Sequence, residues 1–94
     1  MNYAALIKLA VLVMYYVYLL RSESHPKQQY LGSTRNLKER ILEHNSGESS
    51  HTSKFRPWLL VAYFAFSQKK TAIAFERYLK SGSGRAFVKR HFLP

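Results

Sequence analysis

The chain has 94 residues and no cysteine, and 47% of its residues are hydrophobic and 15% aromatic. This length suits one domain, and the apolar content is sufficient for a core, which excludes a chain that is disordered as a whole. The lack of cysteine excludes disulfides, thiol nucleophiles and cysteine-based zinc sites, and it suits a cytoplasmic protein.

The charge balance is strongly basic, with 15 Lys and Arg against five acids and a formal net charge of +10. Such an excess favours a polyanionic partner such as DNA, because neutralising phosphates releases condensed counterions. A basic protein that associates with ribosomes, or is simply soluble, is the alternative. All five acids are glutamates, too few for a two-metal site with several converging carboxylates. We therefore expect any metal-dependent reaction to use one carboxylate and one ion.

The N-terminal part contains an apolar run, residues 4–20, that only Lys8 interrupts. A membrane anchor is one interpretation, since a spanning helix needs about 20 apolar residues. The second half of the run, however, has the Tyr- and Val-rich composition of a strand, and the run lacks the features of a signal peptide. We expect residues 1–13 to be an N-terminal extension and residues 14–94 to be the domain, with Met14 as a candidate start of the native protein.

Two strands are predicted at residues 15–20 and 28–33, and the polar turn between them makes the pair a hairpin. A loop centred near Ser24 would place Tyr18 directly opposite Tyr30. The alternation of side chains separates an apolar face from a second face. The apolar face has Val17, Leu19 and Leu31, and the second face has Tyr18, Tyr30 and Gly32.

The first helix of the domain is predicted over residues 37–45. Asn36 and Glu39 form a capping-box pattern at its start, and Gly47 is a natural stop. Arg40 and His44 lie one turn apart on this helix, beside its buried stripe. They are thus expected to project together.

The second half of the chain contains an apolar run at 58–66, which predicts a third strand. Ser67 is expected to cap a helix over residues 68–80. The sequence SGSG at 81–84 is expected to end that helix, and a short last helix with Arg85 follows.

Glu76 is the acid that we single out, because it lies at the margin of the apolar side of its predicted helix. One interpretation is structural, an ion pair with Arg77, with Lys80 or with a neighbouring strand residue. The other is a ligand for Mg²⁺, which accepts a single carboxylate and keeps several waters.

The other candidates also have two interpretations each. Arg40 is either paired with Glu39 or Glu43, or positioned to stabilise the charge on a phosphate. His44 alone would be a surface histidine, but one turn from Arg40 it is a candidate base or phosphate contact. Tyr18 and Tyr30 suit sheet packing, and a phenol with a pKa of about 10 acts as a base only if cations lower that pKa or if it relays through water.

The order of these residues resembles the GIY-YIG nuclease superfamily. The match comprises Tyr16-Val17-Tyr18, Tyr30-Leu31-Gly32, Arg40, His44 and Glu76, and it covers about residues 14–90. Segments YLGSTRNLKERILEHNSG, RPW and ERYLKSGSGRAFVK are similar to the small stand-alone bacterial branch. Tyr16 stands where the family has Gly, and Leu31 where it has Ile. Neither change removes a reacting group.

The resemblance implies an α/β fold, with a three-stranded antiparallel sheet flanked by helices. It also implies metal-dependent hydrolysis of DNA phosphodiesters, with one Mg²⁺ or Mn²⁺ ion, in DNA repair or processing. In such a site, Tyr18 or Tyr30 helps to deprotonate the attacking water and Arg40 steadies the transition state. His44 would assist proton transfer or bind phosphate, and Glu76 would hold the metal. Gly32 would let the backbone turn closely beside the site, and Asn45 would orient neighbouring groups.

Larger relatives add separate DNA-binding domains to this catalytic domain. We therefore expect the domain itself to contact DNA through its own basic side chains. The candidates are Arg35, Lys54, Arg56, Lys80 and Arg85. The alternative function is a non-catalytic nucleic-acid-binding module that retains the fold and its positive surface.

Overall fold

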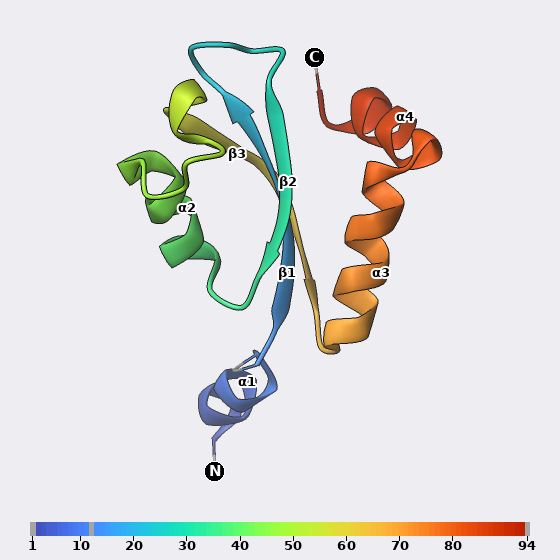
Figure 1. The fold of residues 1–94 in the computed structure, drawn as a ribbon. Coiled ribbons are helices and arrows are strands. Elements are labelled where there is room, and N and C mark those ends of the chain that lie inside the picture. The colour runs from blue at the N-terminus through green and yellow to red at the C-terminus, as the bar shows by residue number, and fades with distance from the viewer. Residues whose placement is uncertain (1, 12, 94) are drawn as a thin grey trace.

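The computed structural model describes residues 2–11 and 13–93, which form one antiparallel sheet with helices on both sides (Figure 1). The order of the strands in the sheet is β2-β1-β3. The expected three-stranded antiparallel sheet flanked by helices is therefore confirmed. The elements in chain order are α1 (Tyr3–Val11), β1 (Tyr15–Ser22), β2 (Gln29–Thr34), α2 (Leu37–Ser46), the 3₁₀ turn η1 (Ser53–Phe55), β3 (Trp58–Phe66), α3 (Lys69–Lys80) and α4 (Gly82–His91).

The central strand β1 is covered on both faces, since α2 lies on one side of the sheet and α3 with α4 on the other (Figure 1). Four consecutive side chains of β1, Val17 to Leu20, are at most 2% exposed. Val17 and Leu19 pack in the α3 and α4 layer, and Tyr18 and Leu20 pack in the α2 layer. Tyr18 is thus a fully buried phenol that must find its hydrogen-bond partners within the protein.

The hairpin register pairs Tyr18 with Gly32 and Leu20 with Tyr30. Tyr18, Tyr30 and Gly32 lie on one face of the hairpin, as predicted. The prediction that Tyr18 lies directly opposite Tyr30 is wrong. The loop is centred on His25, one residue beyond the expected centre, and shifting the centre by one residue moves each partner by two. Tyr30 is therefore a diagonal neighbour of Tyr18.

Helix α2 begins and ends where its capping residues predict. The Glu39 amide donates to Asn36 Oδ1 (3.1 Å), and Gly47 ends the helix with a φ of 84°. The second half of the capping box differs, because the Glu39 carboxylate accepts from the side-chain amide of Asn36 (3.1 Å).

The prediction that SGSG ends α3 and that a short last helix follows is confirmed, but the start of α3 differs from the prediction. Gln68 precedes α3 and no side chain caps it, so the prediction that Ser67 caps this helix is wrong. The SGSG segment begins the last helix, since Ser81 Oγ accepts from the Gly84 amide (3.2 Å). A Cβ on Gly84 would overlap the Tyr78 carbonyl oxygen and lie 2.5 Å from Leu79 Cα, so the helices meet at a glycine contact.

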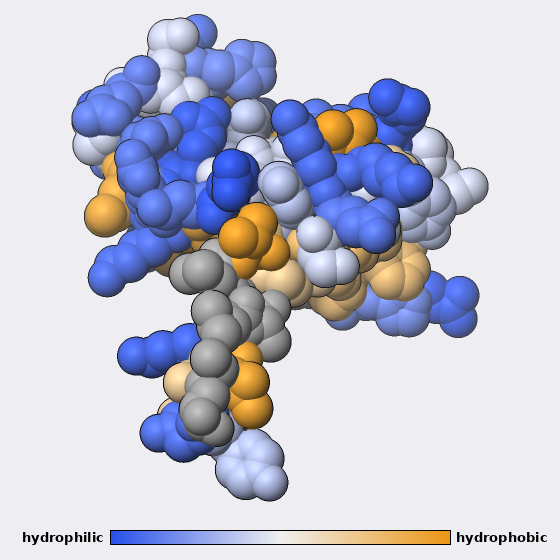
Figure 2. Space-filling model, turned by 90° about the horizontal axis from the view of Figure 1, so that it is seen from below, coloured by the Kyte–Doolittle hydropathy of each residue, from blue (hydrophilic) through white to orange (hydrophobic). Residues whose placement is uncertain are grey.

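Helix α1 projects from the start of β1 and away from the sheet (Figure 1). Tyr3 is 85% exposed and Ile7 63%. Seen from below, α1 protrudes from a face of the domain that carries many hydrophilic side chains (Figure 2). Within residues 2–11 and 13–93, no helix has the length and apolar character needed to cross a membrane.

We predict that Gly84→Ala lowers the free energy of unfolding by about 1–3 kcal/mol, because the new methyl meets backbone atoms that cannot rotate away. Gly82→Ala is the matched control, since a Cβ there meets nothing within 4 Å. Chemical denaturation of both variants measures the difference. Equal stability of the two would contradict the glycine contact.

Candidate active site at the edge of β2

The Tyr18 ring reaches toward the sheet edge across Gly32, its partner on the edge strand β2. A Cβ on Gly32 would lie 2.6 Å from Tyr18 Oη and 2.9 Å from Tyr30 Cε1. Among the described glycines, only Gly47 has a positive φ. Glycine is therefore needed here for side-chain space, which corrects the close backbone turn that the resemblance implies.

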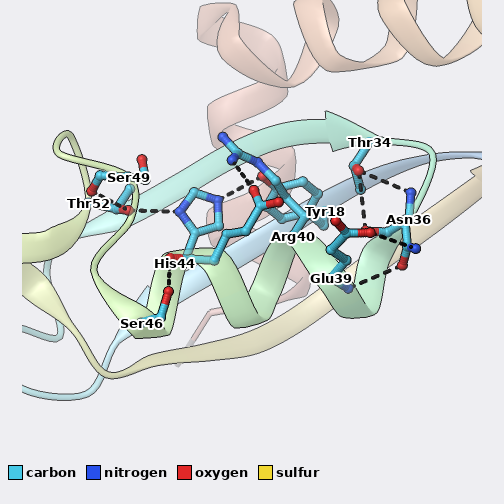
Figure 3. A network of polar contacts seen from close by, with 10 residues as sticks. Tyr18, Thr34, Asn36, Glu39, Arg40, His44, Ser46, Ser49 and Thr52 are labelled. Atoms are coloured by element: carbon cyan, nitrogen blue, oxygen red, sulfur yellow. Dashed lines mark hydrogen bonds and ion pairs between the residues drawn. The ribbon is translucent and has the colours of Figure 1, made fainter.

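His44 is fully buried and lies between Tyr18 and Thr52 (Figure 3). Its Nε2 is 2.9 Å from Tyr18 Oη, and its Nδ1 is 2.7 Å from Thr52 Oγ1. Thr52 Oγ1 donates its own proton to the Ser49 carbonyl (3.5 Å), so it accepts from an Nδ1–H. In this arrangement the lone pair on Nε2 of His44 accepts the hydroxyl proton of Tyr18.

The protonation states agree with that assignment. Burial lowers the pKa of His44, and the nearby Arg40 charge lowers it further, although Glu43 opposes both. Burial raises the pKa of Tyr18 to about 12, despite the opposing effect of Arg40. Near neutral pH, Tyr18 is thus a protonated phenol that faces a neutral imidazole.

Arg40 extends from α2 beside these rings (Figure 3). Its Nη1 donates to Glu43 Oε2 at 2.7 Å, so the expected structural ion pair with Glu43 is present. Hydrogen bonding to Glu43 raises the pKa of Arg40, and the phenols of Tyr18 and Tyr30 contribute to the same effect. Both members of the ion pair are 32% exposed, which leaves the guanidinium accessible from solvent.

Tyr30 completes the aromatic side of the site. Its ring centroid lies 4.7 Å from that of His44 and 6.1 Å from that of Tyr18. The structure thus brings together four of the predicted residues, Tyr18, Tyr30, Arg40 and His44, on the α2 side of β2.

Glu76 approaches the same strand from the α3 side of the sheet. Its Oε2 accepts from Lys80 Nζ at 2.7 Å, which is one of the structural pairs that the sequence suggests. Burial disfavours the charged form of Glu76, but hydrogen bonds from Lys80 and Ser33 outweigh it and lower the pKa. The negative charge of Glu76 in turn contributes to the raised pKa of Tyr18. The candidate site therefore straddles β2, with Gly32 facing the phenols and Ser33 facing the carboxylate.

The donor set fits a single hard cation. In the described part of the chain, no three His, Asp or Glu side chains gather to hold a metal. Glu76 is ionised near neutral pH and its side chain is 21% exposed, so it offers one accessible carboxylate. Mg²⁺ is commonly held by one or two carboxylates together with water and substrate phosphates, which such a site permits.

The basic residues expected to contact DNA lie on both sides of the sheet. Arg35 follows β2 and its guanidinium lies over the Tyr15 ring at 5.4 Å. Lys54 and Arg56 are exposed in and just after η1, near α2, whereas Lys80 ends α3 and Arg85 lies on α4. They do not form one continuous patch on a single helix or loop.

Sequence reasoning missed the residues that support His44. Thr52 lies in a polar loop without periodicity, so nothing in the sequence marks it as the second partner of the imidazole. Trp58 holds this loop, since its indole N–H donates to the Thr52 carbonyl (2.9 Å). Asn45 holds Trp58 in turn, because its side chain accepts from the Trp58 amide (2.6 Å) and donates to the Trp58 carbonyl (3.1 Å).

Comparison with known proteins agrees with this arrangement. The family model of the GIY-YIG catalytic domain matches residues 14–90. A UPF0213 protein of Streptococcus pyogenes serotype M5 is 33% identical over 81% of this chain and 86% of its own length. The solution NMR structure of a UPF0213 protein from Bacillus halodurans is 30% identical, has a TM-score of 0.50 and covers 82% of this chain and 83% of its own.

A second group of relatives is larger. The structure-specific endonuclease subunit SLX1 of Debaryomyces hansenii is 41% identical over 70% of this chain. The chain spans about a fifth of the length of this protein, since the match covers 21% of it.

We predict that Gly32→Ala displaces the Tyr18 ring and breaks its contact with His44. The free energy of unfolding should fall by about 1–3 kcal/mol, because the new methyl overlaps two packed rings. Denaturation measures the stability, and the chemical shifts of the His44 ring report the contact. Unchanged His44 shifts in a folded Gly32→Ala protein would contradict this role of glycine.

We also predict that acid destabilises the protein through His44. Unfolded, this histidine titrates near its ordinary pKa of 6.5, and folded it titrates lower. As the pH falls below 6.5, the unfolded chain therefore binds a proton that the folded protein does not, and the free energy of unfolding falls by at most about 1.4 kcal/mol per pH unit. The loss ends below the folded pKa.

Denaturation curves between neutral and mildly acidic pH test this linkage. His44→Gln should remove most of the slope, whereas His91→Gln, at an exposed position on α4, should retain it. A slope that His44→Gln leaves intact would assign the effect to other groups.

Proposed function

The chain belongs to the GIY-YIG catalytic domain family, and on this basis we propose that it is an endonuclease that hydrolyses DNA phosphodiester bonds with one Mg²⁺ or Mn²⁺ ion. The observation that carries the proposal is the hydrogen bond between the buried Tyr18 phenol and His44, next to a guanidinium at an open strand edge. The SLX1 relatives are named structure-specific endonuclease subunits, which supports the same class of reaction. We further propose a role in DNA repair or processing.

The proposed proton path runs from the attacking water through Tyr18 to His44. A phenol with a pKa of about 12 is not ionised near neutral pH, so it cannot act as a base alone. It can accept a proton from water while it passes its own proton to Nε2 of His44, which is neutral and 2.9 Å away. Thr52 keeps the acceptor nitrogen of His44 turned toward the phenol.

Arg40 is proposed to stabilise the negative charge that develops on the phosphate. A guanidinium offers several N–H donors in one plane, which suits two phosphate oxygens at once. Its partly exposed ion pair with Glu43 stabilises the protein by about 1 kcal/mol, so a phosphate can replace the carboxylate at little cost.

Glu76 is proposed to hold the metal ion, which would neutralise phosphate charge when bound. The carboxylate is ionised, and its partner Lys80 is 53% exposed and free to move into solvent. In this role Glu76 binds and orients, and it takes no proton from the substrate.

A non-catalytic nucleic-acid-binding module is the second candidate function. The two ion pairs, Arg40 with Glu43 and Glu76 with Lys80, favour it, because they occupy the groups that catalysis would need. The buried Tyr18–His44 pair favours the nuclease, because binding DNA needs no proton acceptor inside the domain.

We predict that Tyr18→Phe lowers the cleavage rate by about a hundredfold or more, since it removes the proton relay. Glu76→Gln should also abolish cleavage, because it removes the charged metal ligand. Purified proteins are compared on plasmid, flapped and branched DNA with Mg²⁺ or Mn²⁺. Tyr63→Phe and Glu48→Gln, both at exposed positions, are the matched controls and should cut like the wild type.

Equal cleavage by the wild type, Tyr18→Phe and Glu76→Gln would rule out this mechanism. If the wild type itself does not cut, and it and the variants all bind DNA with a steep salt dependence, the binding module is the correct description.

A further inference from the structure

A pocket of about 560 Å³ lies on the α3 and α4 side of the sheet, between the hairpin and α4. Its apolar wall consists of Leu31, Leu79, Val88 and Leu93. Leu79 and Val88 are at most 4% exposed, so this wall is part of the hydrophobic core. The pocket is large enough for one nucleotide and is distinct from the phenol side of β2.

The polar lining of the pocket is entirely cationic or neutral. Four of the lining residues are basic, Arg21, Lys27, Arg85 and Lys89, and none is acidic. Four like charges around one hollow repel one another, and a bound anion relieves this repulsion. The combination of an aliphatic wall and a cationic rim suits a ligand with both an apolar ring and a phosphate.

Arg21 lines this pocket and has an unsatisfied donor at the base of its guanidinium. Its Nε is buried and has no hydrogen-bond partner among the described residues. Such a group is costly, because it has lost water without gaining an acceptor. A phosphate oxygen in the pocket is an acceptor of the kind that a guanidinium binds best.

The pocket adjoins the Glu76 side of the candidate site. Leu31 and Ser33 lie on the same face of β2, two residues and about 7 Å apart, and α3, which carries Glu76, packs against this strand. Leu79 follows Glu76 by almost one turn of α3, an axial distance of about 5 Å. A DNA strand whose phosphate lies at Glu76 therefore has a neighbouring nucleotide within reach of the pocket.

We infer that this pocket binds an unpaired nucleotide of the substrate strand, next to the phosphate that is cut. Arg21 and Lys89 hold its phosphate, and its base packs on the aliphatic wall. A base that remains paired and stacked in a duplex cannot enter a hollow in the protein, so the pocket selects single-stranded or frayed DNA. The lining has no aromatic residue for stacking and only one amide side chain, Gln29, so we expect little base preference. This inference rests on the proposed function for the placement of the cut phosphate.

The test uses the Glu76→Gln background, in which DNA is not cut during the measurement. Fluorescence anisotropy compares a labelled oligothymidylate with a blunt hairpin duplex of matched phosphate number. Adding Arg21→Gln or Lys89→Gln should weaken binding of the single strand about tenfold, because each variant loses one charge-assisted hydrogen bond. Binding of the duplex should change much less. Arg90→Gln is the matched control, since it removes one charge from the same helix outside the pocket.

Two results would overturn the inference. One is equal weakening by Lys89→Gln and Arg90→Gln, which would show general electrostatic attraction only. The other is a polyglutamate peptide that binds as tightly as the oligothymidylate and with the same sensitivity to Lys89→Gln, which would point to an acidic protein partner. Lys89 is exposed, so its variant keeps the test informative even if Arg21→Gln unfolds the domain.

The outcome is separable from that of the nuclease proposal. If the wild type cuts DNA but the pocket variants behave like Arg90→Gln, the pocket inference alone fails. If the wild type does not cut but the pocket variants lose single-strand binding selectively, the nuclease proposal fails, together with the placement of the pocket beside a cut phosphate, and the single-strand site itself is retained.

Discussion

The site depends on one constraint, a phenol placed in the centre of a covered sheet. Tyr18 is 1% exposed, so its hydroxyl needs a partner inside the protein, and His44 Nε2 supplies it at 2.9 Å. Room for the ring exists only because its cross-strand partner is Gly32. The Thr52 loop, which Trp58 and Asn45 hold in place, then orients the imidazole. The fold and the candidate chemistry thus share the same contacts.

The same burial separates the two protonation equilibria. It raises the pKa of Tyr18 and lowers that of His44, so that the phenol keeps its proton and the imidazole stays able to accept one. Arg40, on the solvent side, adds a positive charge that favours the phenolate and disfavours the imidazolium. Tyr18 and His44 are themselves buried, so the partly exposed groups of the candidate site are the guanidinium of Arg40 and the carboxylate of Glu76, on either side of β2.

The sequence predicts most of the fold, because the signals involved are local. Alternation over the hairpin, the caps of Asn36 and Gly47 and the apolar run of β3 each determine one element. Two details are wrong, the hairpin centre, which lies at His25, and the cap at the start of α3, and the glycine contact at Gly84 is not anticipated. Likewise the resemblance names Tyr18, Arg40, His44 and Glu76, but not Thr52, Ser33 or the reason for Gly32. Those depend on which segments meet across the sheet, and no local pattern encodes that.

The central claim is that neutral His44 accepts the Tyr18 proton, and the nitrogen chemical shifts of the His44 ring test it most directly. Near neutral pH, NMR of ¹⁵N-labelled protein should show a neutral ring with the proton on Nδ1, and Tyr18→Phe should shift the Nε2 resonance. A ring protonated on Nε2, or on both nitrogens, would contradict the account, because the phenol would then have no acceptor.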